Sequence, residues 1–309
     1  MKKDLRIVFM GTPDFAVASL DILVQHGFNV VGVITAPDKP AGRGLQLQES
    51  AVKRYAVNKG LPILQPEKLK NPEFLAALQA LRADLQVVVA FRMLPEIVWN
   101  MPPEGTINVH ASLLPHYRGA APINWAIING EKASGVTTFK LQHEIDTGDI
   151  LFSDEVPIRE DETAGELHDA LMQTGATLLL KTVQAIANGD LKGTPQADIP
   201  TEAIKHAPKI FKETCQINWH TPLDNIYNLV RGLSPYPAAW TVFQGKTLKI
   251  YKAHKEHTTP GKAPGDFDTD QKTYIKIAAP DGYLYLDEIQ LEGKKKMDIT
   301  AFLRGYRFV

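Results

Sequence analysis

The chain has 309 residues, with 34 Lys and Arg residues against 35 Asp and Glu residues and a formal net charge of −1. Its hydrophobic fraction of 44% and charged fraction of 22% are those of an ordinary globular protein, which argues against collagen-like, coiled-coil and disordered chains. The length predicts about two domains, and the near-neutral total by itself argues against a polyanionic partner.

The charge is unevenly distributed along the chain. Residues 1–190 carry 17 basic and 22 acidic side chains, a net charge of −5, whereas residues 191–309 carry 17 and 13, a net charge of +4. Such a split is typical of two modules with different partners, and the basic module suits an anionic one. Chance variation between two solvated surfaces is the alternative explanation.

Cysteine content and apolar runs argue against several other classes. The one cysteine, Cys215, rules out an internal disulfide framework and a Cys-rich zinc site, and the histidines lack the spacing of metal ligands, so we predict no metal. The apolar run 5–10 is too short for a signal-peptide core, and no stretch reaches the ~18–20 apolar residues of a membrane span. We expect a soluble, cytoplasmic protein.

Strand and helix signals alternate through the first two thirds of the chain. Strand signals occur at residues 5–10, 29–35, 62–64, 84–91, 106–110, 136–141 and 150–157. We predict helices after Thr12, Ser50 and Asn71 and over residues 164–188, with Thr12 as the first cap and a long loop at 36–48. This alternation predicts an α/β fold with a mainly parallel, doubly wound sheet.

The pattern changes after residue 189. Residues 190–208 contain Gly and Pro and little periodicity, which predicts a linker. Beyond them, a helix signal at 223–232 precedes strand signals at 240–243, 247–253, 274–278 and 283–290. Short strands separated by turns predict a small OB-like β-barrel. We therefore expect one domain at 1–189, a linker at 190–208 and a second domain at 209–309.

The turn after the first strand lacks the motif of a nucleotide site. Residues 11–15 contain one glycine, whereas a dinucleotide fingerprint needs G-x-G-x-x-G so that the backbone can approach a pyrophosphate. The sequence also lacks a P-loop motif and a G-x-S-x-G nucleophile elbow. These absences argue against an NAD enzyme, a nucleoside-triphosphatase and an α/β-hydrolase.

Two polar residues end one of the apolar strands. Asn108 and His110 stand two positions apart on the strand 106–110, so their side chains project to one face, at the edge where ligands bind in open α/β sheets. Because buried Asn and His side chains require partners, the pair is a poor choice for a core. The alternative is a hydrogen-bonded structural pair.

An acidic loop at 146–149 supplies a third group. Asp146 is positioned to orient His110 and to favour its protonated form, although Asp and Gly also form plain β-turns. Asn, His and Asp together suit acyl transfer to an amine, because the amine must lose a proton and the tetrahedral oxyanion needs a donor. We assign the proton to His110, the oxyanion to Asn108 and the orientation of the imidazole to Asp146.

These motifs together resemble the folate-dependent formyltransferase family. The similarity lies in Asn-x-His-x-Ser-Leu-Leu-Pro-x-x-Arg-Gly at residues 108–119 and in Asp-Thr-Gly-Asp at 146–149. The resemblance implies a Rossmann-like formyl-transfer domain, catalytic roles for Asn108, His110 and Asp146, and 10-formyltetrahydrofolate as the formyl donor. It also implies that the folate site is lined by one loop, which consists of Ser112, Leu113, Leu114 and Pro115.

Three further segments resemble the members of this family that formylate initiator methionyl-tRNA. They are residues 9–16, the loop 37–44, and residues 233–240 in the basic second domain. The resemblance implies that Arg43 enters the acceptor stem, with Lys39 in the same loop, and that the second domain binds the tRNA. Its phosphate-binding candidates, otherwise a solvated run, are Lys294, Lys295 and Lys296. We expect a monomer.

Two segments depart from the family pattern. Leu45 and Gln46 stand where lysines usually follow Gly-Arg-Gly, so this loop is expected to bind RNA less strongly, since each lost phosphate contact reduces both the affinity and its salt dependence. Arg92 stands near the expected folate wall, where it either points outward or meets the acidic tail of the folate.

The resemblance thus implies transfer of a formyl group from 10-formyltetrahydrofolate to the α-amine of initiator methionyl-tRNA. A formyltransferase acting on a sugar-nucleotide amine would have the same three side chains but would need neither the Arg43 loop nor a basic second domain. Two alternatives belong to other classes. One is a folate hydrolase in which water replaces the amine, and the other is a non-catalytic RNA-binding protein, against which the intact trio argues.

Overall fold

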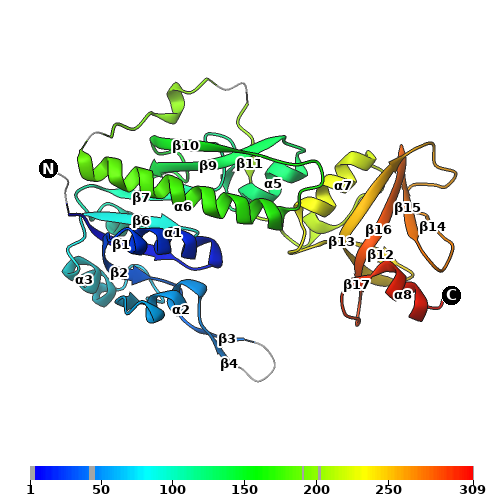
Figure 1. Ribbon diagram of the computed structural model, residues 1–309, viewed down its shortest axis with the longest axis horizontal. Coiled ribbons are helices and arrows are strands. Elements are labelled where there is room, and N and C mark those ends of the chain that lie inside the picture. Colours follow the sequence, from blue (N-terminus) through cyan, green and yellow to red (C-terminus); the bar gives the residue numbers. More distant parts are fainter. Residues whose placement is uncertain (1–3, 42–45, 190, 201–202, 309) are drawn as a thin grey trace. The chain divides into compact units, whose positions relative to one another are not determined.

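The computed structural model describes residues 4–41, 46–189, 191–200 and 203–308, and the chain divides into two compact units (Figure 1). The first unit consists of Met1–Gly119, Ser134–Val156 and His168–His206. The second consists of Ala120–Ala133, Pro157–Leu167 and Ala207–Val309. Two segments that precede residue 189 are therefore part of the second unit.

A seven-stranded sheet forms the centre of the first unit, in the order β10-β9-β7-β6-β1-β2-β5. Its strands are β1 (Arg6–Gly11), β2 (Asn29–Ile34), β5 (Ile63–Leu64), β6 (Leu85–Val89), β7 (Thr106–His110), β9 (Ala133–Lys140) and β10 (Ile150–Pro157). The five strands from β5 to β7 in this order pair in parallel, and β9 pairs antiparallel with β7. The predicted α/β fold with a mainly parallel, doubly wound sheet is confirmed.

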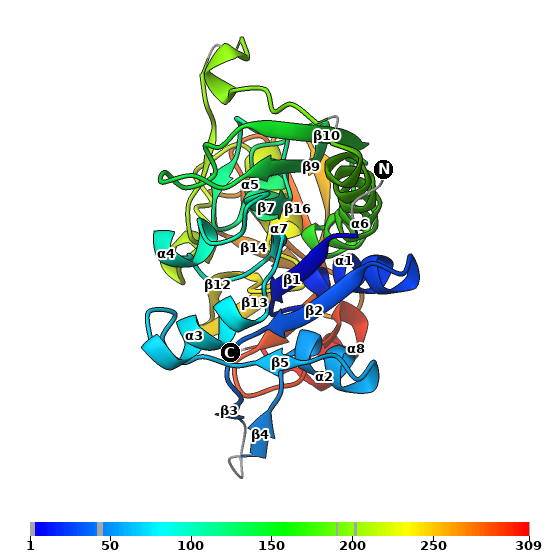
Figure 2. The same ribbon diagram turned by 90° about the vertical axis from the view of Figure 1, so that its left-hand side faces the viewer.

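Helices cover both faces of this sheet. Helices α1 (Asp14–Gln25) and α6 (Ala164–Asn188) lie on one face, and α3 (Pro72–Ala80) and α4 (Glu96–Trp99) lie on the other (Figure 2). Because both faces are covered, every residue of β6 is buried, and four of its five residues are apolar. This arrangement leaves the strand ends as the places where polar side chains can meet a ligand.

Local signals predicted the starts of α2 and α3 correctly and that of α1 with an error of one residue. Ser50 caps α2 (Ala51–Asn58) and Asn71 caps α3, each by accepting a hydrogen bond from a main-chain N–H of the first turn. Thr12 was expected to cap α1, but the cap residue is Pro13 and no side chain bonds there. Thr12 is thus no cap, because the helix begins one residue later than the sequence pattern indicates.

The segment 36–48, predicted as a long loop, contains two short strands. β3 (Lys39–Ala41) pairs antiparallel with β4 (Gln46–Gln48). Proline in a strand is confined to edges because it lacks the N–H donor, so Pro40 argued against a strand in the sequence. A two-stranded hairpin has no central strand, and it therefore tolerates Pro40.

A curled antiparallel sheet and three helices form the second unit (Figure 1). Its strands are β12 (Ala239–Phe243), β13 (Lys246–His257), β14 (Phe267–Thr269), β15 (Ile275–Ala279), β16 (Gly282–Leu291) and β17 (Met297–Asp298). Its helices are α5 (Pro122–Ile128), α7 (Leu223–Gly232) and α8 (Ile299–Gly305). Leu223, Ile226 and Val230 of α7 pack into the core that this sheet encloses. The predicted smaller β domain is confirmed as a curled half-barrel.

None of the helices in the described ranges is long and apolar enough to cross a membrane. The same ranges contain no group of three or more His, Cys, Asp or Glu side chains arranged to hold a metal ion.

Candidate active site

The site is built around the end of β7. Asn108 and His110 lie two residues apart on this strand, so they share a face, as the sequence predicts. His110 is 7% exposed, and its main chain is paired with Thr137 of β9. Asn108 is half-buried, and its side chain has no hydrogen bond within the part of the chain that the structure describes. A partly buried amide without a protein partner is free to donate to a ligand.

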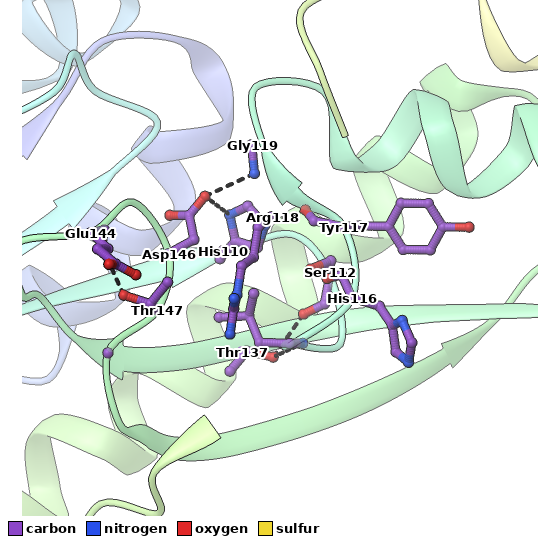
Figure 3. A network of polar contacts seen from close by, with 12 residues as sticks. His110, Ser112, His116, Tyr117, Arg118, Gly119, Thr137, Glu144, Asp146 and Thr147 are labelled. Atoms are coloured by element: carbon purple, nitrogen blue, oxygen red, sulfur yellow. Dashed lines mark hydrogen bonds and ion pairs between the residues drawn. The ribbon is translucent and has the colours of Figure 1, made fainter. Parts of the chain in front are cut away.

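The two ring nitrogens of His110 face different acceptors (Figure 3). Nε2 lies 2.9 Å from the carbonyl oxygen of Tyr117. Since a carbonyl oxygen only accepts, Nε2 carries the hydrogen of this bond, and Nδ1 is the nitrogen that is free to exchange a proton. Nδ1 lies 3.9 Å from Oδ2 of Asp146, which is an ion-pair distance and too long for a hydrogen bond.

Asp146 lies on the loop between β9 and β10 and is more than a turn residue. Its side chain is 11% exposed, and its Oδ2 accepts a 2.9 Å hydrogen bond from the Gly119 main chain (Figure 3). Gly148 lets this loop fold tightly, because a Cβ there would lie 1.6 Å from the carbonyl oxygen of Lys140. The structure therefore brings all three predicted catalytic side chains into one region of the first unit.

The loop Ser112–Pro115 follows β7 directly and is held by Thr137. Thr137 Oγ1 donates to the Ser112 carbonyl at 2.7 Å and accepts from the Leu114 main chain at 3.1 Å. Ser112 Oγ in turn donates to the His116 carbonyl at 2.8 Å. Ser112 and Leu114 are buried and Leu113 is half-buried, so the predicted folate loop is a firmly packed turn beside His110.

Two residues of this site could not be predicted from the sequence. Tyr117 contributes only its carbonyl oxygen, for which a sequence carries no signal. Gln196 lies in η1 (Gln196–Asp198), within the segment predicted as a linker, and is 5% exposed. Its Nε2 donates to the carbonyls of Asp146 and Gly148, both at 2.8 Å. No local pattern distinguishes such a glutamine from a solvated one.

Arg92 is held by main-chain carbonyls. Its Nη1 donates to the Glu67 carbonyl at 2.7 Å and its Nη2 donates to the Pro66 carbonyl, while the guanidinium lies 5.4 Å from the Phe91 ring. Desolvation lowers the pKa of Arg92. Of the two orientations left open by the sequence, the structure shows the side chain bound to the loop at 66–67.

The predicted RNA-binding residues lie far apart in the sequence and on both units. Lys39 is exposed on β3, whereas Arg43 and Leu45 lie outside the described residues. Lys294, Lys295 and Lys296 are all exposed in the turn between β16 and β17. Lys296 forms an ion pair with Glu288 of β16 at 3.1 Å, so its charge is already partly neutralised within the protein.

Both units match family models. Residues 5–183 match the formyl transferase model, and residues 209–307 match the model of the formyl transferase C-terminal domain. A methionyl-tRNA formyltransferase of Parabacteroides distasonis is 58% identical over 99% of this chain and 97% of its own length. One from Flavobacterium johnsoniae is 51% identical over 98% and 97%.

Solved structures share the fold at lower identity. WlaRD, described as a sugar 3N-formyl transferase, has a TM-score of 0.68 and 22% identity and covers 95% of this chain and 100% of its own. HypX from Aquifex aeolicus, in complex with tetrahydrofolic acid, has a TM-score of 0.64 and 19% identity over 98% of this chain and 47% of its own. The family-model matches and the high identities over nearly the full length decide the assignment: the chain belongs to the formyl transferase family, and within it to the methionyl-tRNA formyltransferases.

Proposed function

We propose that the chain transfers the formyl group of 10-formyltetrahydrofolate to the α-amino group of initiator methionyl-tRNA. The observation that carries this proposal is the 58% identity, over 99% of the chain, to a protein named methionyl-tRNA formyltransferase. The basic second part of the chain supports an RNA acceptor, because it carries 17 basic against 13 acidic side chains beyond residue 190. A folate donor is supported by the tetrahydrofolate bound to a protein of the same fold.

His110 is proposed to take the proton of the attacking amine. The amine nitrogen forms a bond to the formyl carbon, and its excess proton must leave before the product is neutral. Nδ1 of His110 can accept that proton, because Nε2 is engaged with the Tyr117 carbonyl. The Asp146 carboxylate, 3.9 Å from Nδ1, then stabilises the imidazolium that forms.

Asn108 is proposed to stabilise the oxyanion. As the amine attacks, the electron pair of the formyl C=O moves onto oxygen. Collapse of this intermediate breaks the carbon–nitrogen bond to the folate, whose nitrogen leaves with the proton that His110 took from the amine. The Asn108 amide has no hydrogen bond within the described ranges, so its N–H groups remain available for that oxygen. The loop Ser112–Pro115, fixed by Thr137, is proposed to form part of the folate site.

RNA contacts are proposed on both units. Arg43 and Lys39 are assigned to the acceptor stem, and Lys294, Lys295 and Lys296 to phosphates elsewhere on the tRNA. We assign catalysis to residues 1–189, a linker to 190–208 and tRNA binding to 209–309, which the family-model boundaries at 183 and 209 support. We further propose a monomer in the cytoplasm.

One assay distinguishes this function from its alternatives. The protein is incubated with a labelled formyl donor and is offered methionyl-tRNA, uncharged tRNA, an amino-sugar nucleotide or no acceptor. We expect label on methionyl-tRNA alone. Label on the amino sugar would favour the sugar enzyme, formate released without an acceptor would favour hydrolysis, and tRNA binding without transfer would leave a non-catalytic RNA-binding protein.

A further inference from the structure

Gln196 makes four hydrogen bonds with a side chain that is 5% exposed. Its Nε2 donates to the carbonyls of Asp146 and Gly148, both at 2.8 Å. Its Oε1 accepts from Nε and Nη2 of Arg118, at 3.0 and 2.6 Å. A carboxamide has two N–H donors and one oxygen with two lone pairs, so every bonding position of Gln196 is used. Such a saturated, buried amide holds its partners in one arrangement.

The loop that Gln196 holds has an unfavourable backbone. Asp146 has φ +56°, in the left-handed region that residues other than glycine rarely adopt. A backbone of this kind persists only where its surroundings fix it, and such residues occur mostly at functional sites. Gln196 binds the carbonyl of Asp146 itself and that of Gly148, two residues later. The two bonds therefore oppose relaxation of the loop to a more favourable conformation.

The same contacts link the Asp146 loop to the segment that follows Ser112–Pro115. Asp146 Oδ2 accepts from the Gly119 main chain, and the neighbouring Arg118 side chain binds Gln196. Asp146, Gln196 and the dipeptide Arg118–Gly119 thus form a closed hydrogen-bonded circuit. This circuit fixes the direction of the carboxylate, whose Oδ2 faces Nδ1 of His110 at 3.9 Å.

The segment around Gln196 is also anchored independently of its side chain. Thr194 and Ile150 exchange two main-chain hydrogen bonds of 2.8 Å. Ile199 packs against the small core of Leu114, Phe139 and Ile150. Because these contacts remain when the Gln196 side chain is replaced, a Gln196 variant should keep the segment in position and lose only the four side-chain bonds.

We propose that Gln196 is a positioning residue for catalysis, which orients the Asp146 carboxylate toward His110 from within the segment between the two family-model regions. The inference rests on the proposed formyl transfer, and it adds a group that the catalytic trio does not contain. Gln196 itself is proposed to act through Asp146 and not through substrate.

The test compares Gln196→Leu with wild type in formyl transfer to methionyl-tRNA. We expect kcat to fall about 10- to 100-fold, because small displacements of a catalytic group carry losses of this order, while KM for methionyl-tRNA changes less than about twofold. A lower kcat with a nearly unchanged KM is the split expected of a residue that positions a catalytic group, whereas a merely structural role would affect kcat and KM together.

A double-mutant cycle separates positioning from general destabilisation. If Gln196 acts through Asp146, the variant carrying both Gln196→Leu and Asp146→Asn should lose no more kcat than Asp146→Asn alone. Losses that multiply would overturn the proposal. Gln86→Leu is the matched control, since Gln86 is a fully buried glutamine of β6 whose replacement should leave kcat nearly unchanged.

A second variant keeps the test valid if Gln196→Leu does not fold. Gln196→Glu retains an oxygen for Arg118 but loses the Nε2 donors to Asp146 and Gly148, so it should show the same fall in kcat with a nearly unchanged KM. A wild-type kcat in a folded Gln196 variant would overturn the inference. Absence of transfer by the wild-type protein would instead overturn the proposed function.

Discussion

Asp146 Oδ2 lies 3.9 Å from His110 Nδ1 and accepts a hydrogen bond from the Gly119 main chain in the same conformation. The carboxylate is thus fixed by the backbone while its charge faces the imidazole. His110 is fixed on its other side by the Tyr117 carbonyl. The pair is arranged so that a proton arriving at Nδ1 is stabilised without movement of either side chain, which is the preorganisation that proton transfer requires.

Replacing the charge of Asp146 tests this arrangement. Asp146→Asn retains an oxygen for the Gly119 N–H but removes the negative charge opposite His110. We expect kcat to fall by about 10²- to 10⁴-fold, the range of general acid–base contributions, because the imidazolium that forms on His110 loses its neighbouring negative charge. Asp154→Asn, at an exposed position on β10, is the control. An Asp146→Asn variant with the kcat of that control would contradict the assignment.

Asn108 is predicted to act on the oxyanion alone. Asn108→Ala should lower kcat by about 10²- to 10³-fold, the usual cost of one oxyanion donor, and should leave the melting temperature nearly unchanged. The reason is that the Asn108 side chain makes no hydrogen bond within the described ranges that folding would lose. Single-turnover rates and thermal unfolding, measured on the same preparations, check this. A large drop in melting temperature with wild-type kcat would indicate instead that Asn108 and His110 form a structural pair.

The first unit could be predicted from sequence where its signals are local. The apolar strands, the caps Ser50 and Asn71, and the two-residue spacing of Asn108 and His110 each follow from neighbouring residues. Short helices such as α4 and α5 were missed, because four to seven residues show too little periodicity to identify a helix. Gln196 was missed because its partners lie 48 to 78 residues away in the chain.

The charge split leads to a prediction about tRNA binding. Lys294→Gln combined with Lys295→Gln should raise KM for methionyl-tRNA and reduce the slope of log KM against log salt by about 0.9 per lost phosphate contact. Lys296→Gln should have a smaller effect, because Lys296 already pairs with Glu288. Lys70→Gln, at an exposed lysine of the first unit, is the control. Unchanged KM values at low and high salt would show that these lysines do not bind tRNA.

Asp38, which directly precedes β3, should make the stability of the fold depend on pH. Hydrogen bonds from Lys53 and Gln65 hold the pKa of the Asp38 carboxyl below its usual value. A carboxyl with a lowered pKa in the folded state stabilises the fold above its unfolded value of about 3.9, and this contribution is lost as the pH falls through the folded value. Asp38→Asn should therefore lower the melting temperature by less at pH 2.5 than at pH 7. An equal decrease at both pH values would contradict the ion pair's role.

The most direct test of the account is the single-turnover rate of formyl transfer to methionyl-tRNA by His110→Ala, at saturating concentrations of both substrates. Saturation removes effects of the substitution on substrate binding. Because His110 is buried, thermal unfolding checks separately that the variant is folded. We predict a rate about 10²- to 10⁴-fold below that of wild type, with the formyl donor still bound. A folded His110→Ala protein that transfers formyl at the wild-type rate would contradict the proposed mechanism.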